Sequence, residues 1–441
     1  MTAELIVMNK NGLALAADSA VTVSAGGRAT KVYNTANKLF MLSKVHPVGV
    51  MIYGSAEIMG LPWEIVIKRF RERLGYRSFP SIDEYVDSFF NHLTSEAFAP
   101  ECYIAYVRQR AVDLFNAIAS DADERVQKTI QEHGEIEEED IEAAHADAVA
   151  DAYNHIRDIQ RQLKIKRSDI AESMNTHRDV VRKTINDLLE NRPVKGSHKR
   201  KLIDACLIAA IVFPSMNQSG LVIAGFGDDD VFPSAKAFDI LKILDGNIQF
   251  LPTFEGSVTL DNTAQIKAFA QSNETTNFMN GVSGRISEYI DDDMKGILSG
   301  AYSEKVTELL VQEGIVPEEK GDDCKARLGH AGLGVHSFIK SSVDDISARE
   351  FSGPVVRAVA FFSPTEMATM AETLLSLESF RQQVTLRSET VGGPIDVAVI
   401  TRGDGYIWIK RKHYFKPELN HQFFSNYNRN MEVESDDQDN G

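Results

Sequence analysis

The chain has 441 residues, of which 43% are hydrophobic and 25% charged, and its formal net charge is −17. This composition is typical of a soluble globular protein with one large or two ordinary domains, and its acidity argues against binding to nucleic acid or to anionic membranes. No apolar run approaches the ~20 residues that span a bilayer, no basic and apolar leader opens the sequence, and the three cysteines are too widely spaced to suggest a disulfide framework, so we expect a cytoplasmic protein.

Short apolar runs follow one another through the first 60 residues. They are Leu5–Met8, Leu13–Ala17, Leu39–Leu42 and Val48–Tyr53. Asn11-Gly12 separates the first two runs and predicts a hairpin. Asp18 closes the second run, Lys38 opens the third, and Gly54 ends the fourth. Helix-like spacing then begins near Ile58.

Thr2 follows a methionine, which is removed when a small residue comes next, so the mature chain is expected to begin with a hydroxyl and a free α-amine on one residue. An α-amine titrates near pH ~7.7–8 and can accept a hydroxyl proton at neutral pH. A threonine paired with its own amine is a known activated nucleophile.

Thr2, Asp18, Lys38 and Gly54, in this order, resemble the N-terminal nucleophile (Ntn) hydrolases of the proteasome β-subunit and HslV type. The resemblance implies that Thr2 attacks an amide carbonyl, that Lys38 lowers the pKa of the nucleophile, that Asp18 holds Lys38 by an ion pair, and that the Gly54 N–H stabilises the oxyanion. Lys31 competes with Lys38, because Lys38 lies a few residues further from Asp18 than in the family. Lys38 is preferred because it opens an apolar run. The implied chemistry needs no metal and no organic cofactor.

By the same resemblance, Thr22 binds the substrate backbone through its main chain, and Val21, Ile52 and Ala56 line an apolar first specificity pocket. The implied activity is that of a threonine endopeptidase acting on peptides or unfolded proteins, in a homo-oligomer that encloses its active threonines and can work with an ATP-dependent unfoldase. Two alternatives remain: an Ntn hydrolase of a small amide, and a non-catalytic scaffold subunit.

Similarity to the family returns later in the chain, in the buried run Ser219–Gly227, in Gly392–Thr401, and in the Asp404-Gly405 turn that makes a second hairpin. The family places a supporting Asp and Ser just before the Gly-Gly pair, where this chain has Ser388 and Val391. Glu389 and Thr390 are the candidate substitutes. The implied fold is α+β, a four-layer αββα Ntn-hydrolase sandwich with a helical insertion.

The chain divides into a first core segment (1–80), a helical insertion (81–215), a second core segment (216–420) and a disordered acidic tail (421–441). In the second core segment we expect helices at Thr259–Glu288 and Pro364–Gln383. Ser363, Pro364 and Glu366 form a strong helix start.

Two minor signals lie in the insertion. His145 and His155 flank acidic residues at a spacing that could bind a metal, but a solvated helix face is the favoured reading. Ser168–Leu189 lies in a basic stretch and has a helix-turn-helix pattern, with Asn175 in the turn and Val181 in the second helix. Nucleic-acid binding by this pair is weighed against two packed helices with a solvated basic face, and the latter is preferred.

Overall fold

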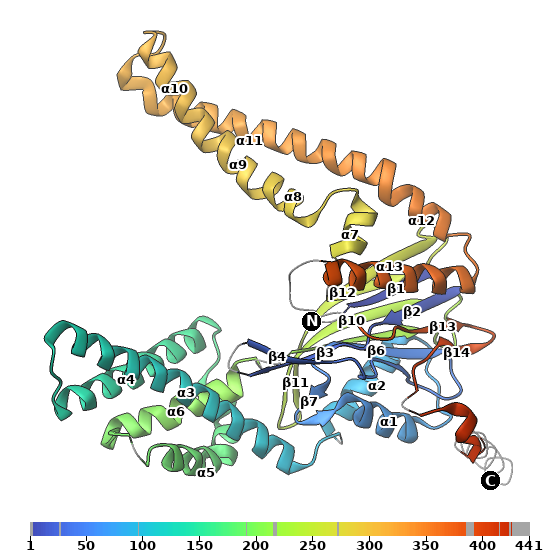
Figure 1. The fold of residues 1–441 in the computed structure, drawn as a ribbon, viewed down its shortest axis with the longest axis horizontal. Coiled ribbons are helices and arrows are strands. Elements are labelled where there is room, and N and C mark those ends of the chain that lie inside the picture. Colours follow the sequence, from blue (N-terminus) through green and yellow to red (C-terminus); the bar gives the residue numbers. More distant parts are fainter. Residues whose placement is uncertain are drawn as a thin grey trace.

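The computed structural model describes residues 3–25, 28–95, 97–190, 192–214, 218–270, 273–384, 392–413, 415–422 and 425, with the side chains of residues 22–32 and 417 outside this description. Helices and antiparallel sheets make up the fold (Figure 1), as expected for an α+β protein. The predicted tail 421–441 lies outside the described residues except at 421, 422 and 425.

Two antiparallel five-stranded sheets form the centre of the molecule. The first has the order β12 (Ala264–Ala270), β1 (Ala3–Asn9), β2 (Gly12–Ala17), β13 (Asp396–Thr401), β14 (Gly405–Lys410). The second has the order β11 (Asn247–Ser257), β10 (Ser234–Leu244), β9 (Ser219–Gly225), β6 (Val48–Gly54), β5 (Leu39–Met41). Two small hairpins, β3–β4 (Val21–Ala25 and Arg28–Tyr33) and β7–β8 (Glu57–Ile58 and Leu61–Pro62), lie beside them. The predicted first and last hairpins, β1–β2 and β13–β14, are confirmed.

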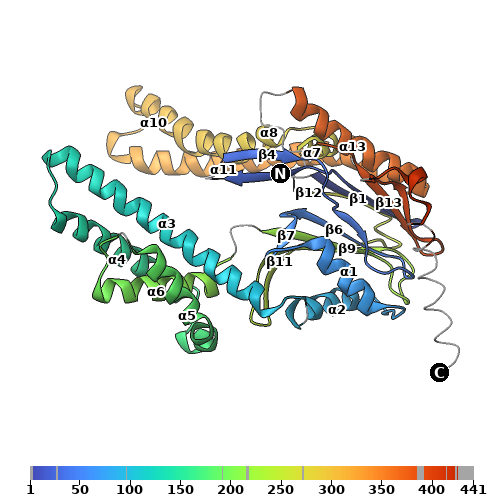
Figure 2. The same cartoon turned by 60° about the horizontal axis from the view of Figure 1, so that its bottom comes forward.

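The two sheets pack face to face, and each is covered by helices on its other face (Figure 2). Met8, Leu15, Met51 and Val222 lie in the core between the sheets. Helices α1 (Trp63–Leu74) and α2 (Ile82–Ser95) cover the second sheet, and α13 (Pro364–Val384) with α12 (Gly353–Val359) covers the first. Because both faces of β1 and β2 are covered, every residue of these strands is buried, which explains why they read as continuous apolar runs.

Two predicted helix starts have different outcomes. Ser363 and Glu366 form the expected capping box at α13: the Ser363 N–H donates to Glu366 Oε2 at 2.7 Å, and the Glu366 N–H donates to Ser363 Oγ at 3.4 Å. Helix α1 begins at Trp63 and not near Ile58, because Met59 and Gly60 turn the chain with φ of 53° and 76°.

A separate helical bundle comprises α3 (Pro100–His133), α4 (Glu138–Gln162), α5 (Ala171–Leu188) and α6 (Gly196–Val212), with its own apolar core. The segment 81–215 is therefore shared between two cores, since α2 packs on the second sheet and the bundle starts at α3. Ser168–Leu189 does not form a pair of helices, so both the helix-turn-helix expectation and the preferred reading as two packed helices are wrong. Asn175 lies inside the continuous helix α5, because Met174, Val181 and Ile185 recur at helical spacing and all face the bundle core.

A second helical extension links β12 to α13 and projects from the sheets as a long arm (Figure 1). It contains α7 (Asn273–Asn280), α8 (Gly284–Glu288), α9 (Met294–Gly296), α10 (Tyr302–Gln312) and α11 (Gly321–Ile346), joined in part by wider helical turns of π type. Gly332 lets the two halves approach closely, since a Cβ there would lie 2.2 Å from the Leu298 carbonyl oxygen. The predicted helix Thr259–Glu288 is wrong over Ala264–Ala270, because this segment is the strand that covers the edge of β1.

Among the described residues, none of the helices has the length and apolarity that a membrane span requires.

Candidate functional site

Asp18 links three segments of the chain at one end of the first sheet. It directly follows β2 and is fully buried. Its Oδ1 accepts the N–H of Ala3 at 3.2 Å, and its Oδ2 accepts the N–H of Gly392 at 3.0 Å. Its own N–H donates to the Ala3 carbonyl at 3.1 Å. The carboxylate is therefore held rigidly between the start of β1 and the loop before β13.

Lys38 reaches the same carboxylate from the second sheet. Its ammonium donates to Asp18 Oδ1 and lies 3.3 Å from Glu4 Oε1, and its side chain is 3% exposed. Its carbonyl accepts the N–H of Ile52 at 2.9 Å, which fixes the residue at the entrance of β5. The predicted Asp18–Lys38 ion pair is present and is buried between the two sheets.

This burial is costly. Desolvating a carboxylate and an ammonium costs several kcal/mol per ion, and apolar residues of similar volume often stabilise a protein as well or better. The pair is therefore weak evidence for a role in stability. Charged groups buried at a site with several backbone donors are candidates for a functional role.

Gly54 ends β6 at the same end of the sheets. The residue two positions earlier, Ile52, is bonded to the Lys38 carbonyl, so the turn after β6 lies close to Lys38 along the sheet. Gly54 has φ of 77°, and a Cβ there would lie 2.7 Å from the Gln218 carbonyl oxygen. Both features favour glycine at this turn.

Several predicted residues fall on parts that the structure does not describe. Thr2 lies outside the described residues, although Ala3, the residue bonded to it, is the one held by Asp18. The backbones of Thr22 and Lys31 lie in β3 and β4, with side chains outside the description. The positions before the Gly-Gly pair, which are Ser388, Glu389, Thr390 and Val391, also lie outside it.

The other expected pocket residues lie at different depths. Val21 and Ala56 are partly buried. Ile52 is 2% exposed, and its side chain packs in the cluster beneath α1 and α2.

Sequence analysis missed two contributors to this site. Glu4 is fully buried beside Lys38, and its signal in the sequence was an acid inside an otherwise apolar strand. Ser19 donates its N–H to the Gly392 carbonyl at 3.3 Å and its hydroxyl to the Pro394 carbonyl. These bonds fasten the loop before β13 to the end of β2.

Tyr53 adds a further polar contact next to Gly54. Its hydroxyl donates to Asp239 Oδ1 at 2.8 Å, and its ring lies over Gly220, where a Cβ would come within 1.9 Å of the ring. Burial raises the pKa of Tyr53 above its ordinary value, so the phenol remains a neutral donor.

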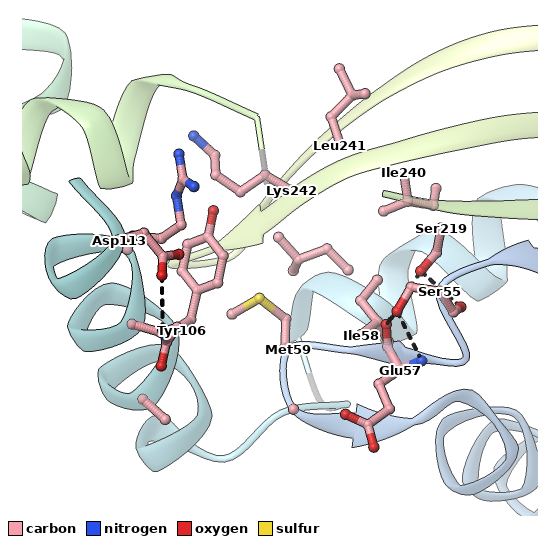
Figure 3. A pocket seen from close by; sticks show the side chains of 15 residues that line it. Ser55, Glu57, Ile58, Met59, Tyr106, Asp113, Ser219, Ile240, Leu241 and Lys242 are labelled. Atoms are coloured by element: carbon pink, nitrogen blue, oxygen red, sulfur yellow. Dashed lines mark hydrogen bonds between the residues drawn. The ribbon is translucent and has the colours of Figure 1, made fainter. Parts of the chain in front are cut away.

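A cavity of about 370 Å³ opens beside the turn that follows Gly54. Ser55, Met59, Tyr106 and Lys242 are among the side chains around it (Figure 3). The Ser219 hydroxyl donates to the Ser55 carbonyl at 3.2 Å and so holds this turn against β9. Sequence analysis did not find this cavity, since its walls come from α3, β10 and the β7–β8 hairpin.

The metal alternative has no support in the structure. His145 is 6% exposed and not on a solvated face: Nδ1 lies 2.9 Å from the Ile141 carbonyl oxygen, and Nε2 lies 3.1 Å from Arg192 Nη1. His155 is exposed. Over the described part of the chain, no three His, Cys, Asp or Glu side chains are grouped so that they could hold a metal ion.

No protein-family model matches the sequence, and a search of curated proteins returns no match.

Proposed function

We propose that this protein is an N-terminal nucleophile hydrolase in which Thr2, exposed by removal of Met1, cleaves amide bonds. The arrangement of helices, two antiparallel sheets and helices supports the finer fold assignment, a four-layer αββα sandwich of the Ntn-hydrolase type. The proposed reaction is peptide-bond hydrolysis.

The observation that carries the proposal is that one oxygen, Asp18 Oδ1, accepts from both the Ala3 N–H and the Lys38 ammonium. The lysine charge is therefore held beside the start of β1, and Thr2 is the residue bonded to Ala3. A positive charge there favours the ionised hydroxyl. A buried acid, a buried lysine and the start of β1 meet at one point, as a threonine nucleophile requires.

The proposed mechanism assigns one role to each group. The Thr2 hydroxyl attacks the carbonyl carbon of the substrate, and its α-amine takes the proton. Lys38 stabilises the developing negative charge, and Asp18 fixes the ammonium in place. The Gly54 N–H donates to the oxyanion, a contact that is worth about 3–4 kcal/mol when such a donor is removed in other enzymes. The α-amine then returns its proton to the leaving amine, and water releases the acyl group.

The test combines N-terminal mass analysis with two variants of the nucleophile. We expect intact mass to show the chain beginning at Thr2, Thr2→Ala to have no turnover, and Thr2→Ser to keep a measurable part of it. A panel of fluorogenic peptides differing at the cleaved residue should show a preference for apolar side chains, because Val21 and Ala56, the two expected pocket residues that are not fully buried, carry no charge.

Three outcomes would count against the proposal. Quantitative retention of Met1 removes the amine base and favours the non-catalytic scaffold. A Thr2→Ala variant as active as the parent rules out this nucleophile. A clear preference for Arg or Asp at the cleaved position contradicts the apolar pocket.

The second candidate within the same chemistry is the hydrolysis of a small amide by the same groups. Hydrolysis of short acyl amides without cleavage of any peptide in the panel would select this candidate.

We also propose that the protein assembles as a homo-oligomer. The arm carries apolar side chains that are at least half exposed in the single chain, among them Tyr302, Leu309, Val335 and Phe338. They lie on two helices, α10 and α11, and exposed apolar surface marks interaction sites. Light scattering at micromolar concentration should give a mass of several chains, and Phe338→Asp should lower it. A monodisperse monomer would disprove this assembly.

A further inference from the structure

The cavity beside Ser55 has a polar end, with Tyr106 and Lys242, and an apolar wall, with Ile58 and Met59, that lies between this end and Ser55 and Ser219 (Figure 3). Ile243 also lines the cavity. The polar end is formed by Tyr106 and Arg110 on α3 and by Lys242 on β10. The polar end and the apolar wall border a partly open space between α3 and the second sheet.

The polar end contains hydrogen-bond donors without acceptors. Among the described residues, the Tyr106 hydroxyl and the Arg110 Nε–H are buried and have no hydrogen-bond partner. Leaving such a group buried and unpaired lowers the stability of the protein, and more so for a charged group. Lys242 donates to the Ile211 carbonyl, which uses one of the three N–H donors of its ammonium.

The two cationic side chains at the cavity are less exposed than the two carboxylates. Lys242 is 6% exposed and Arg110 is partly buried, whereas Glu57 and Asp113 are exposed, with Asp113 beside Tyr106 (Figure 3). Asp113 already accepts the Gln109 side-chain N–H at 2.9 Å. The interior therefore presents two cations and an unpaired phenol, an environment that attracts a negatively charged acceptor.

We propose that this cavity binds a small molecule with an apolar chain that ends in a carboxylate. The carboxylate lies between Arg110, Lys242 and Tyr106, where it satisfies the unpaired donors, and the chain packs against Ile58, Met59 and Ile243. A volume of about 370 Å³ lies within the usual range for small-ligand sites. The planar guanidinium of arginine matches the two oxygens of a carboxylate. This site is independent of the role proposed for Thr2.

The binding test uses hexanoate as the probe, with hexanamide and hexylammonium as uncharged and cationic controls of matched length, measured by isothermal titration and ligand-observed NMR on the full chain. We expect hexanoate to bind at least tenfold more tightly than either control. Arg110→Met and Lys242→Met should each weaken hexanoate binding tenfold or more, and Tyr106→Phe should weaken it severalfold.

Glu57→Gln is the matched control, because it removes an exposed charge and none from the polar end. It should bind hexanoate as tightly as the parent or slightly more tightly. Tyr106→Phe changes one oxygen atom and keeps the packing, so it tests the site even if the Met variants prove unstable. Equal affinity for hexanoate and hexanamide, or unchanged hexanoate binding by Tyr106→Phe, would overturn the proposal.

Proton linkage gives a second readout. Burial lowers the pKa of Lys242 to about 8, Arg110 acts in the same direction, and Asp245 opposes it; the Tyr106 hydroxyl is the other titratable group beside it. A bound carboxylate favours the charged lysine, so hexanoate binding should take up protons near pH 8 and weaken as the pH rises above that value. Lys242→Met should abolish both effects, and their persistence in that variant would exclude Lys242 from the site.

Discussion

Replacing Lys38 with Met should lower the free energy of unfolding by about 3–5 kcal/mol, because Asp18 would then remain buried without its cationic partner. Turnover should fall by about 100-fold or more through loss of the charge beside the nucleophile. Chemical denaturation and hydrolysis of the best peptide substrate measure the two effects. The burial of Lys38 beside Glu4 and Asp18 makes it part of the core as well as of the proposed site.

A double variant separates charge burial from catalysis. Asp18→Asn combined with Lys38→Met removes both charges of the pair, so the loss of stability should be smaller than the sum of the two single losses. Its turnover should stay as low as that of Lys38→Met. Lys31→Met is the control for the choice of lysine and should keep activity. Loss of turnover in Lys31→Met, with activity retained in Lys38→Met, would show that Lys31 is the active-site residue.

Replacing Gly54 with Ala should destabilise the protein by about 2 kcal/mol or more and reduce turnover on the order of 100-fold. The residue has φ of 77°, which costs an alanine about 1–2 kcal/mol, and the added Cβ would lie 2.7 Å from a backbone oxygen. The turn has to shift to relieve this contact, and the proposed oxyanion donor shifts with it. Thermal unfolding and steady-state kinetics measure the two effects.

Gly60 is the matched control for this substitution. Its φ of 76° is nearly the same as that of Gly54, but a Cβ there meets nothing within 4 Å. Gly60→Ala should therefore lower the free energy of unfolding only by the strain of an alanine at positive φ, about 1–2 kcal/mol. Turnover should be unchanged. Equal loss of turnover in the two variants would mean that Gly54 has no special role in catalysis.

The strands around the site were predictable because the signals are local. Asn11-Gly12 fixes one turn, and β1, β2 and β6 each read as a short apolar run. Asp18 and Lys38 could be paired in advance only through the resemblance to a known family, because nothing in the spacing of the two residues shows that they meet. Thr2 remains a prediction, since it lies outside the described residues.

The missed features depend on contacts between distant segments. Ala264–Ala270 has a composition that fits either a helix or a strand, and its pairing with β1 decides the outcome. Asparagine is common in turns, yet the spacing of apolar residues around Asn175 continues through α5. The cavity that contains Arg110 and Lys242 joins residues more than 100 positions apart, so no local pattern could have indicated it.

The central position of β2 also sets the time at which the site can form during synthesis. Its neighbour β13 pairs with it so that Asp396 lies opposite Ala17. The Gly392 N–H donates to Asp18 across a separation of 374 residues. At ~5–20 residues per second, a ribosome needs roughly 20–75 s to make that length of chain. Throughout this interval Asp18 lacks one of its donors and one edge of β2 is unpaired. The nascent polypeptide therefore cannot carry a fully assembled site, because the Gly392 donor to Asp18 is added only when the last strands emerge.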